Sequence, residues 1–279
     1  MEQWLRKVAI VTGASGGIGA DIVESLVRAG VKVVGVARRV EKIQNLADKL
    51  TGHKGVLHPM ECDVRKEEDI SRVFEWTEKN LGGVDILVNN AAVLLSDPII
   101  GKLIWRTFRK KMPDEKPTKK ADATINVIAV AIFTREAVSS MRKRDVPGHI
   151  ININSIVGHN TEFMPVPANL YCASKFAVTA MSQSVRMELA AAKINVKVTS
   201  ISPGAVKTDM LANIGLPSET FERVPKLAGK DIADAVIYAL ATNPNVQVRQ
   251  KNIRCYCRIH ISMAFQQVEE VTVTPVMTV

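Results

Sequence analysis

A glycine-rich turn directly behind an apolar run is the strongest constraint on the fold of this chain. The apolar run Val8–Val11 leads into Thr12–Gly19 (TGASGGIG), and a helical pattern begins inside that stretch. Glycines in such a turn let backbone N–H groups at the start of the helix approach a pyrophosphate. An ordinary strand-to-helix turn explains one glycine but not three. The pattern therefore predicts a dinucleotide cradle, with cofactor contacts from Gly13, Ser15, Ile18 and Gly19.

Apolar runs alternate with amphipathic stretches along most of the 279 residues. Strands are expected at 7–12, 32–37, 55–60, 84–89, 148–154 and 196–202. Helices are expected at 17–29, 41–50, 66–80, about 121–143 and 171–192, followed by a helix near 230–242 and a final strand at Val271–Thr274. Strands nearly continuous in Val and Ile indicate a parallel sheet covered on both faces. The sequence thus predicts one α/β domain over residues 1–279, a Rossmann-type doubly wound parallel sheet flanked by helices.

The net charge of +9 is concentrated in two segments. Residues 102–120 carry eight Lys and Arg against two acidic residues, and residues 249–258 carry four Lys and Arg. Nucleic-acid binding by the fold itself would require a broader basic face, and no nucleic-acid motif accompanies these segments. We therefore expect no nucleic-acid partner. The regions around these charges, at about 98–120 and 248–267, lack clean periodicity and are atypical for the fold.

Composition argues against several other classes of protein. No stretch approaches the roughly 18 consecutive apolar residues of a membrane span, and the first residues lack the apolar core of a secretory signal. The cysteines are too few and too scattered for a disulfide framework or a metal site; they are Cys62, Cys172, Cys255 and Cys257. We expect free thiols, no bound metal and a cytoplasmic location.

The end of the second strand indicates which dinucleotide is bound. An acidic side chain there binds the ribose 2′-hydroxyl of NAD, but in this chain Ala37 is followed by Arg38 and Arg39. Two guanidinium groups suit a 2′-phosphate, so NADP is favoured over NAD, with Ser15 as a further phosphate contact. In the alternative interpretation, Arg39 only solvates the start of a helix.

Two later strands also end in residues suited to a dinucleotide. Asp63 and Val64 follow the third strand, and the Asp63 carboxylate would accept a hydrogen bond from the adenine amino group. Asp63 is equally suited to cap the next helix. After the fourth strand, Asn89–Ala92 (Asn-Asn-Ala-Ala) places amides and small side chains along the cofactor. We expect Asn90 to be a cofactor contact.

Tyr171 and Lys175 lie four residues apart, so on a helix their side chains share one face. A phenol with a pKa near 10 is a poor base at neutral pH, and a neighbouring ammonium group favours the phenolate. Ser155 closes an apolar strand at the edge where the sites of α/β proteins form, and its hydroxyl could hold a substrate oxygen. Such Tyr-x-x-x-Lys pairs often only decorate a helix, but the cradle and Ser155 favour a catalytic role.

Taken in order, these motifs resemble those of the short-chain dehydrogenase/reductase family over residues 5 to about 247. The resemblance rests on Thr12–Gly19, Asn89–Ala92, Asn126, Ser155, Tyr171, Lys175 and Pro203-Gly204. Within the family, Thr134–Val138 and Gly148–Ser155 are similar to the insect farnesol dehydrogenase-like group and its vertebrate relatives.

The resemblance implies a role for each matching residue. Tyr171 would be the acid/base, Lys175 would hold the nicotinamide ribose and lower the pKa of Tyr171, and Ser155 would polarise the reacting oxygen. Asn126 would keep a water relay to Lys175 in place. The cofactor carboxamide would be held by residues after the sixth strand, namely Val206 and Thr208. The resemblance also implies a homo-oligomer, a dimer or tetramer, paired through the helices that carry Asn126 and Tyr171.

The chain departs from the family pattern at three places. Asn89–Ala92 ends in Ala where the family usually has Gly, which adds a methyl group near the cofactor. The two atypical segments are longer than the corresponding connections in the family. They are either insertions in this lineage or translated intron sequence, and transcript sequencing would distinguish the two.

The function expected from these residues is that of an NADP-dependent oxidoreductase. It would interconvert a hydrophobic alcohol, such as farnesol or a steroid or retinoid, with its aldehyde or ketone. Apolar side chains after Pro203 would close over such a substrate, or only pack a lid; they are Met210, Leu211, Ile214, Leu216, Phe221 and Val224. The alternative function is that of a catalytically impaired NADP-binding paralogue, disabled by the two insertions.

Overall fold

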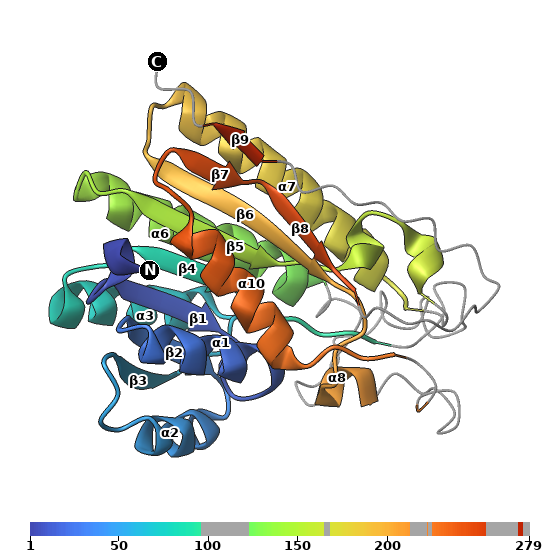
Figure 1. The fold of residues 1–279 in the computed structure, drawn as a ribbon, viewed down its shortest axis with the longest axis horizontal. Coiled ribbons are helices and arrows are strands. Elements are labelled where there is room, and N and C mark those ends of the chain that lie inside the picture. The colour runs from blue at the N-terminus through green and yellow to red at the C-terminus, as the bar shows by residue number, and fades with distance from the viewer. Residues whose placement is uncertain (96–122, 165–167, 213–221, 223–224, 255–272, 276–279) are drawn as a thin grey trace.

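The computed structural model describes residues 1–95, 123–164, 168–212, 222, 225–254 and 273–275 (Figure 1). The first atypical segment, at about 98–120, lies outside the described residues. So do residues 255–267 of the second atypical segment. Of the apolar residues expected to close over a substrate, only Met210 and Leu211 are described.

A parallel sheet of seven strands forms the centre of the molecule. Its strands are β1 (Val8–Thr12), β2 (Lys32–Ala37), β3 (Val56–Glu61), β4 (Ile86–Asn89), β5 (Gly148–Ile153), β6 (Val196–Pro203) and β8 (Gln250–Ile253). Their order in space is β3-β2-β1-β4-β5-β6-β8, and all neighbours are parallel. The chain builds outward from β1 to β3, then crosses back to β4, so the strand order reverses between β1 and β4. The prediction of a doubly wound sheet in a single domain is confirmed.

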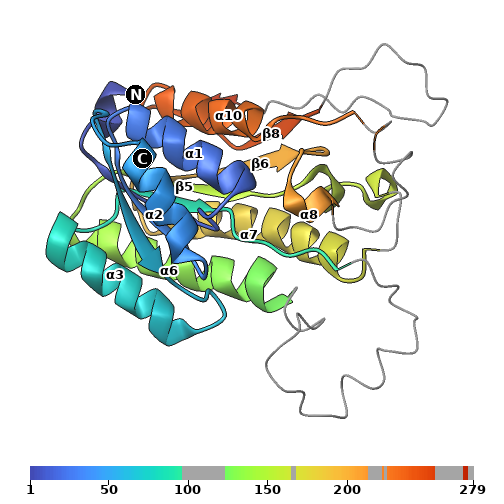
Figure 2. The same ribbon diagram turned by 90° about the horizontal axis from the view of Figure 1, so that it is seen from below.

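Helices cover both faces of this sheet (Figure 2). One layer holds α1 (Gly17–Arg28), α2 (Val40–Lys49) and α10 (Gly229–Ala241), and the other holds α3 (Glu67–Leu81), α6 (Ala129–Lys143) and α7 (Tyr171–Ala191). A π-helical turn, Thr124–Ile128, leads into α6. Three shorter elements follow β5 and β6, namely the 3₁₀ turns Ile156–Gly158 and Thr161–Phe163 and the helix α8 (Asp209–Ala212).

Each face of the sheet packs against its helices in a separate hydrophobic core. Strand β1, which is apolar from Val8 to Val11, contributes side chains to both cores. All five of its residues are buried. Ala9 and Val11 face the core that contains α1 and α10, whereas Val8 and Ile10 face the core with Phe133 of α6. Successive side chains of a strand point to opposite faces, so a strand covered on both faces needs apolar residues at every position. Burying each large aliphatic side chain contributes about 1.5–3 kcal/mol.

The C-terminal edge of the sheet differs from the sequence prediction. The strand that pairs with β6 is Gln250–Ile253, inside the segment that the sequence marks as atypical. The predicted strand at Val271–Thr274 is present as β9 (Val273–Pro275), but it pairs antiparallel with β7 (Val246–Val248) outside the main sheet. The residues of β8 are mostly polar and half-buried, as suits an edge strand. Hydrophobic periodicity does not detect such a strand.

One helix in the described part of the chain, Thr124–Lys143, is long and apolar enough to span a membrane by length and composition alone. Half of this apolar stretch is buried inside the protein. Phe133, Ala137 and Met141 from this helix pack into the core against the sheet. The helix is therefore a core element of this fold.

Candidate active site

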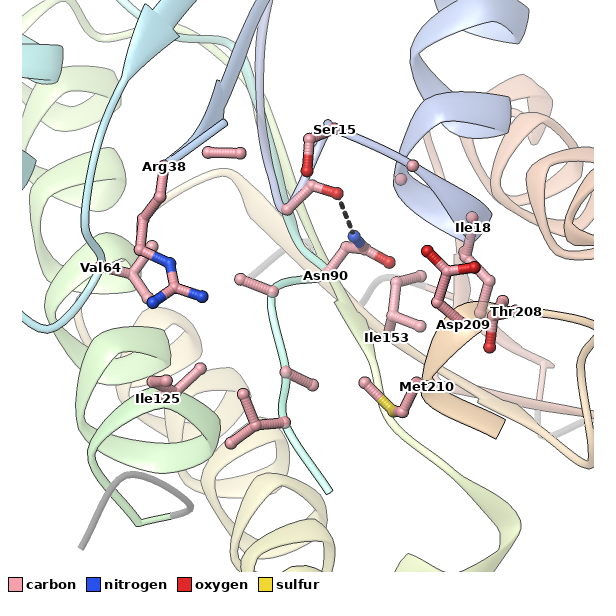
Figure 3. A pocket seen from close by; sticks show the side chains of 18 of the residues that line it. Ser15, Ile18, Arg38, Val64, Asn90, Ile125, Ile153, Thr208, Asp209 and Met210 are labelled. Atoms are coloured by element: carbon pink, nitrogen blue, oxygen red, sulfur yellow. Dashed lines mark hydrogen bonds between the residues drawn. The ribbon is translucent and has the colours of Figure 1, made fainter. Parts of the chain in front are cut away.

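A cavity of about 330 Å³ opens at the carboxyl ends of the strands, beside the reversal between β1 and β4. This is the position at which open α/β sheets bind their ligands. Arg38 and Val64 lie on one side of it, Ile18 and Thr208 on the other, and Asn90 lies between them (Figure 3). The expected cofactor residues that line it are Gly13, Ser15, Ile18, Gly19, Arg38, Arg39, Asp63, Val64, Asn90, Tyr171, Lys175 and Thr208.

The turn between β1 and α1 has room for a dinucleotide only because of its glycines. Gly13 has a φ of +70°, and a Cβ there would lie 2.8 Å from Asn90 Nδ2. A Cβ at Gly19 would lie 2.2 Å from the Gly13 carbonyl oxygen, so no larger residue fits between helix and strand. The helix is preceded by Gly16, and no side chain caps its first N–H groups. These N–H groups are the donors that a pyrophosphate needs, so the cradle fits a dinucleotide.

Asn90 clamps the end of β4 to this turn. Its Nδ2 atom donates to the carbonyl oxygens of Thr12 at 2.9 Å and Gly13 at 3.3 Å. In return, Thr12 Oγ1 accepts hydrogen bonds from the backbone N–H groups of Asn90 and Ala91, both at 2.9 Å. The Asn90 side chain therefore holds the glycine-rich turn against the end of β4.

Ser15 and the arginines after β2 meet at one end of the cavity. Arg39 Nη2 donates to Ser15 Oγ at 3.4 Å, which brings a guanidinium and a hydroxyl together at this end of the cavity. Arg38 lines the same end of the cavity. Donors of this kind, with no carboxylate at Ala37, suit a phosphate on the ribose.

Asp63 lines the cavity but is already engaged within the protein. Its Oδ1 accepts a hydrogen bond from Arg65 Nε at 2.9 Å and another from the Arg65 backbone N–H at 3.1 Å. Hydrogen bonding by Arg65 is the main reason that the pKa of Asp63 lies below its usual range. Lys66 occupies the N-cap position of the helix that follows and makes no side-chain capping hydrogen bond, so the alternative role of Asp63 as the N-cap is wrong.

Tyr171 and Lys175 lie together at the start of α7, and both are buried, at 8% and 4% exposure. Lys175 Nζ donates to the carbonyl oxygen of Ile153 at 2.8 Å and lies 5.7 Å from the centre of the Tyr171 ring. Burial lowers the pKa of Lys175 to about 8. The last residue of β5 therefore holds an amine against the phenol that begins α7.

Ser155 follows β5 by two residues and begins a tight turn. It precedes the 3₁₀ turn Ile156–Gly158, and its Oγ accepts a hydrogen bond from the backbone N–H of Val157 at 3.3 Å. The turn packs against α7 through Thr179 Oγ1, which donates to the Gly158 carbonyl at 3.0 Å. Ser155 and Lys175 thus meet the same end of β5.

Asn126 lies in the π-helical turn, a geometry that often marks a functional position. Its side chain bonds both backbone groups of Val93, each at 2.9 Å, and donates to Ser174 Oγ at 3.0 Å. Ser174 in turn donates to the Tyr171 carbonyl at 2.7 Å. Asn126 therefore joins the chain after β4 to the first turn of α7, and the water relay to Lys175 stays a prediction.

The structure also places residues that the sequence reasoning missed or placed differently. Val206 is buried in the core and does not line the cavity. Ile125 and Asp209, which the sequence reasoning did not predict, line the cavity near the start of α6 and in α8. Met210, one of the residues expected to close over the substrate, lines it as well. The partners Val93, Ser174 and Ile153 were not expected, because two of them act through backbone atoms and Ser174 looks like an ordinary helix residue.

An apolar cluster adjoins Tyr171 on the side of the loop after β5. Its buried members are Val157, Ala168 and Tyr171, with Leu94, Ile156, Phe163, Met164 and Cys172 packed against them. The cluster places apolar surface next to the phenol, where the body of a substrate would lie.

In the part of the chain that the structure describes, no group of three or more His, Cys, Asp or Glu could hold a metal. Cys62 and Cys172 are free thiols there. Burial raises the pKa of Cys62 to about 12, so this thiol stays protonated. Cys255 and Cys257 lie outside the described residues.

Comparison with known proteins agrees with this architecture. Among solved structures, a short-chain type dehydrogenase/reductase from Mycobacterium marinum superposes with a TM-score of 0.74 at 25% identity, over 90% of this chain and 95% of that one. A metagenomic short-chain oxidoreductase solved in complex with NADP superposes with a TM-score of 0.70 at 27% identity, over 91% and 99% of the two chains.

Sequence relatives cover nearly the whole chain. Farnesol dehydrogenase of Aedes aegypti is 44% identical over 256 residues, 91% of this chain and 98% of that protein. Dehydrogenase/reductase SDR family member 11 of Mus musculus is 40% identical over 264 residues, 91% of this chain and 96% of that protein. The short chain dehydrogenase family model matches residues 7–218. The chain therefore belongs to the short-chain dehydrogenase/reductase family and is an oxidoreductase that acts between alcohols and carbonyl compounds.

Proposed function

We propose that this protein is an NADP-dependent oxidoreductase that interconverts a hydrophobic alcohol and its aldehyde or ketone, with Tyr171 as the acid/base. The observation that carries the proposal is the buried pair of Tyr171 and Lys175 lining the cofactor cavity, with Nζ 5.7 Å from the phenol ring centre. A buried cation beside a phenol favours the phenolate, which is the form that can accept a proton.

In alcohol oxidation, the Tyr171 phenolate takes the proton of the substrate hydroxyl as hydride leaves the carbinol carbon. The nicotinamide ring supplies the hydride acceptor when the cofactor is bound. The Ser155 hydroxyl donates a hydrogen bond to the substrate oxygen, and Lys175 binds the nicotinamide ribose. Asn126 keeps the first turn of α7 in register through Ser174. In reduction, Tyr171 returns its proton to the carbonyl oxygen.

NADP is the proposed cofactor in preference to NAD. Arg38, Arg39 and Ser15 surround the end of the cavity where a ribose 2′-phosphate would lie, and Ala37 offers no carboxylate to an NAD ribose. The metagenomic oxidoreductase of the same fold binds NADP. The remaining contacts would come from residues that line the cavity, namely Gly13, Ile18, Gly19, Asp63, Val64, Asn90 and Thr208. A contact from Val206 rests on the family resemblance alone.

The proposed substrate is a hydrophobic alcohol of the isoprenoid type, such as farnesol, or a steroid or retinoid. The apolar cluster beside Tyr171 supports this class, because an apolar wall gains free energy from burying a hydrocarbon body. The name of the mosquito relative, farnesol dehydrogenase, points in the same direction.

We also propose a homo-oligomer, a dimer or tetramer, in the cytoplasm. Large apolar side chains remain exposed on the helices expected to pair, including Ile128 at 53%, Phe176 at 41% and Met187 at 74%. A second copy of the chain would cover them. Light scattering on the purified protein tests this, and a monomeric mass would refute it.

The alternative, a catalytically impaired NADP-binding paralogue, is not favoured. Asn126, Ser155, Tyr171 and Lys175 are all present in the sequence. Tyr171 and Lys175 line the cavity, and Asn126 is joined to the first turn of α7 through Ser174. An impaired paralogue has no need to keep this set together.

The experiment that tests the proposal is a coupled absorbance assay of purified protein with NADP(H) and NAD(H). The substrates are farnesol, retinol and a panel of steroids, each offered as alcohol and as carbonyl compound. We expect NADP-linked turnover of at least one hydrophobic substrate. Tight NADPH binding with no turnover of any of them would support the impaired paralogue instead.

A further inference from the structure

We propose that His159 is a positioning residue for hydride transfer, because its imidazole ties the turn that carries Ser155 to the end of strand β6. His159 Nε2 and Ser202 Oγ lie 2.8 Å apart, and they belong to two different segments, the turn after β5 and the end of β6. The inference rests on the proposed function, since it assigns the role of Ser155 and of the residues after β6.

The turn on the Ser155 side is short and internally bonded. The Gly158 N–H donates to the Ser155 carbonyl at 3.0 Å, and the His159 N–H donates to the Ile156 carbonyl at 3.1 Å. His159 is therefore the first residue after the 3₁₀ turn, and its backbone is fixed relative to Ser155. A hydrogen bond to the His159 side chain therefore also restrains the position of the turn.

The partner on the other side belongs to the strand end that leads to Pro203 and Gly204. Ser202 is fully buried, and among the described residues its side chain makes this one hydrogen bond, to His159. The backbone beside it is held by β8, since the Gly204 N–H donates to the Ile253 carbonyl at 2.7 Å. The His159 imidazole is thus a side-chain link between the segment that would hold the substrate oxygen and the segment that would hold the nicotinamide.

The surroundings of His159 keep the imidazole neutral. Burial is the main cause, and the nearby Arg254 guanidinium the second, of a pKa below the usual value. Arg254 itself is fixed by stacking on Phe163, with its Cζ 4.3 Å from the ring centre. A neutral imidazole offers one N–H donor and one acceptor, which suits a fixed bridge to a hydroxyl.

The competing explanation is that His159 only stabilises the fold. A second contact of the turn allows the two roles to be told apart. The turn has a second, independent anchor, the hydrogen bond from Thr179 Oγ1 to the Gly158 carbonyl. Without the imidazole the turn should therefore stay folded, and its start stays bonded to β6 through the Asn154 N–H and the Ile201 carbonyl at 2.7 Å. The far end of the turn, at His159, would no longer be held to Ser202. Small displacements of reacting groups slow chemistry strongly while leaving cofactor binding intact.

The test uses the full-length protein and four variants, His159→Ala, Ser202→Ala, the double variant and His159→Gln. The matched control is His58→Ala, which removes a half-buried imidazole packed against the Trp76 ring at a tilt, away from the cavity. The measurements are the single-turnover rate of NADPH oxidation, the isotope effect with NADPH deuterated at the transferred position, and the dissociation constant for NADPH.

We expect His159→Ala and Ser202→Ala each to slow hydride transfer about 10-fold to 100-fold. The double variant should be no slower than the slower single variant, because both remove the same link. The isotope effect should rise and the NADPH dissociation constant should stay within about 2-fold. His159→Gln should recover most of the rate, because an amide offers Ser202 Oγ both a donor and an acceptor.

Two results would overturn the inference. One is a single-turnover rate within 2-fold of wild type in both single variants; the other is losses that add in the double variant. Should His159→Ala fail to fold, Ser202→Ala alone carries the same test, since it removes a single oxygen atom. Absence of NADPH oxidation in wild type and in the His58→Ala control would instead refute the proposed function, so the two failures are distinguishable.

Discussion

Lys175 Nζ lies 5.7 Å from the centre of the Tyr171 ring while donating to the carbonyl of Ile153, the last residue of β5. One strand end thus determines where an amine and a phenol meet. The arrangement has an energetic consequence, because a fully buried ammonium group is deprived of water and its pKa falls to about 8. The groups proposed for catalysis are therefore also a source of instability in the protein without cofactor.

Replacing Lys175 by Met tests this cost through the pH dependence of stability. Below about pH 8 the amine carries a proton in both the folded and the unfolded chain, and the full burial penalty applies. Between about pH 8 and 10.5 the folded chain releases this proton while the unfolded chain keeps it. The unfolding free energy of wild type should therefore rise by about 3 kcal/mol relative to Lys175→Met across that window.

The measurement is chemical denaturation at a series of pH values without cofactor. Lys79→Met, on the exposed side of α3, is the control and should show no such relative change. A constant difference between wild type and Lys175→Met from pH 7 to 10.5 would show that the amine is not buried in the charged form.

Removing the guanidinium groups after β2 tests the cofactor preference. Arg38→Ala and Arg39→Ala should each raise the KM for NADP by about 10-fold to 100-fold, the loss expected for one hydrogen bond to a charged group. The KM for NAD should change little, because NAD has no phosphate at this position. Arg28→Ala, which removes an exposed partner of Glu24 on α1, is the control. An equal effect on NADP and NAD would contradict a 2′-phosphate contact.

The fully buried His149 predicts a loss of stability in acid. Its Nε2 lies 2.8 Å from Thr199 Oγ1, whose proton goes to the Val248 carbonyl at 2.6 Å, so His149 must be the donor to Thr199. Burial, and to a lesser extent Lys197, lowers the pKa of His149 to about 3. As the pH falls below 6.5 the unfolded chain binds a proton at this site that the folded chain refuses.

The unfolding free energy of wild type should accordingly fall by about 2 kcal/mol relative to His149→Gln between pH 6.5 and pH 5. Denaturant melts at the two pH values measure this, with His53→Gln as the histidine control. Parallel pH dependence of wild type and His149→Gln would mean that His149 gains its proton in the folded state.

Local chemistry explains which parts of the site could be predicted from the sequence. The glycines around Gly13 and the four-residue spacing of Tyr171 and Lys175 carry their meaning within a few residues. The alternation of apolar strands and amphipathic helices, together with this turn, predicts the doubly wound sheet, because strands that are apolar on both faces must be covered by helices on both faces. These predictions need no knowledge of long-range contacts.

Long-range and backbone-mediated contacts explain the rest. The carbonyl of Ile153 holds Lys175, and the backbone of Val93 holds Asn126, yet a backbone group leaves no trace in the residue type. Among the described strands β8 is paired on one side only, and its residues are mostly polar, so its sequence looks like a loop. The Val206 side chain packs into the core rather than into the cavity, which motif position alone does not reveal.

The most direct test of the central claim is the single-turnover rate of hydride transfer in Tyr171→Phe, with Tyr238→Phe on the exposed face of α10 as the control. The substitution removes only the phenolic oxygen, so NADPH should bind with nearly unchanged affinity. Hydride transfer should slow by about 10²-fold to 10⁴-fold, the usual contribution of a positioned acid/base. A Tyr171→Phe variant that turns over as fast as wild type would contradict the account.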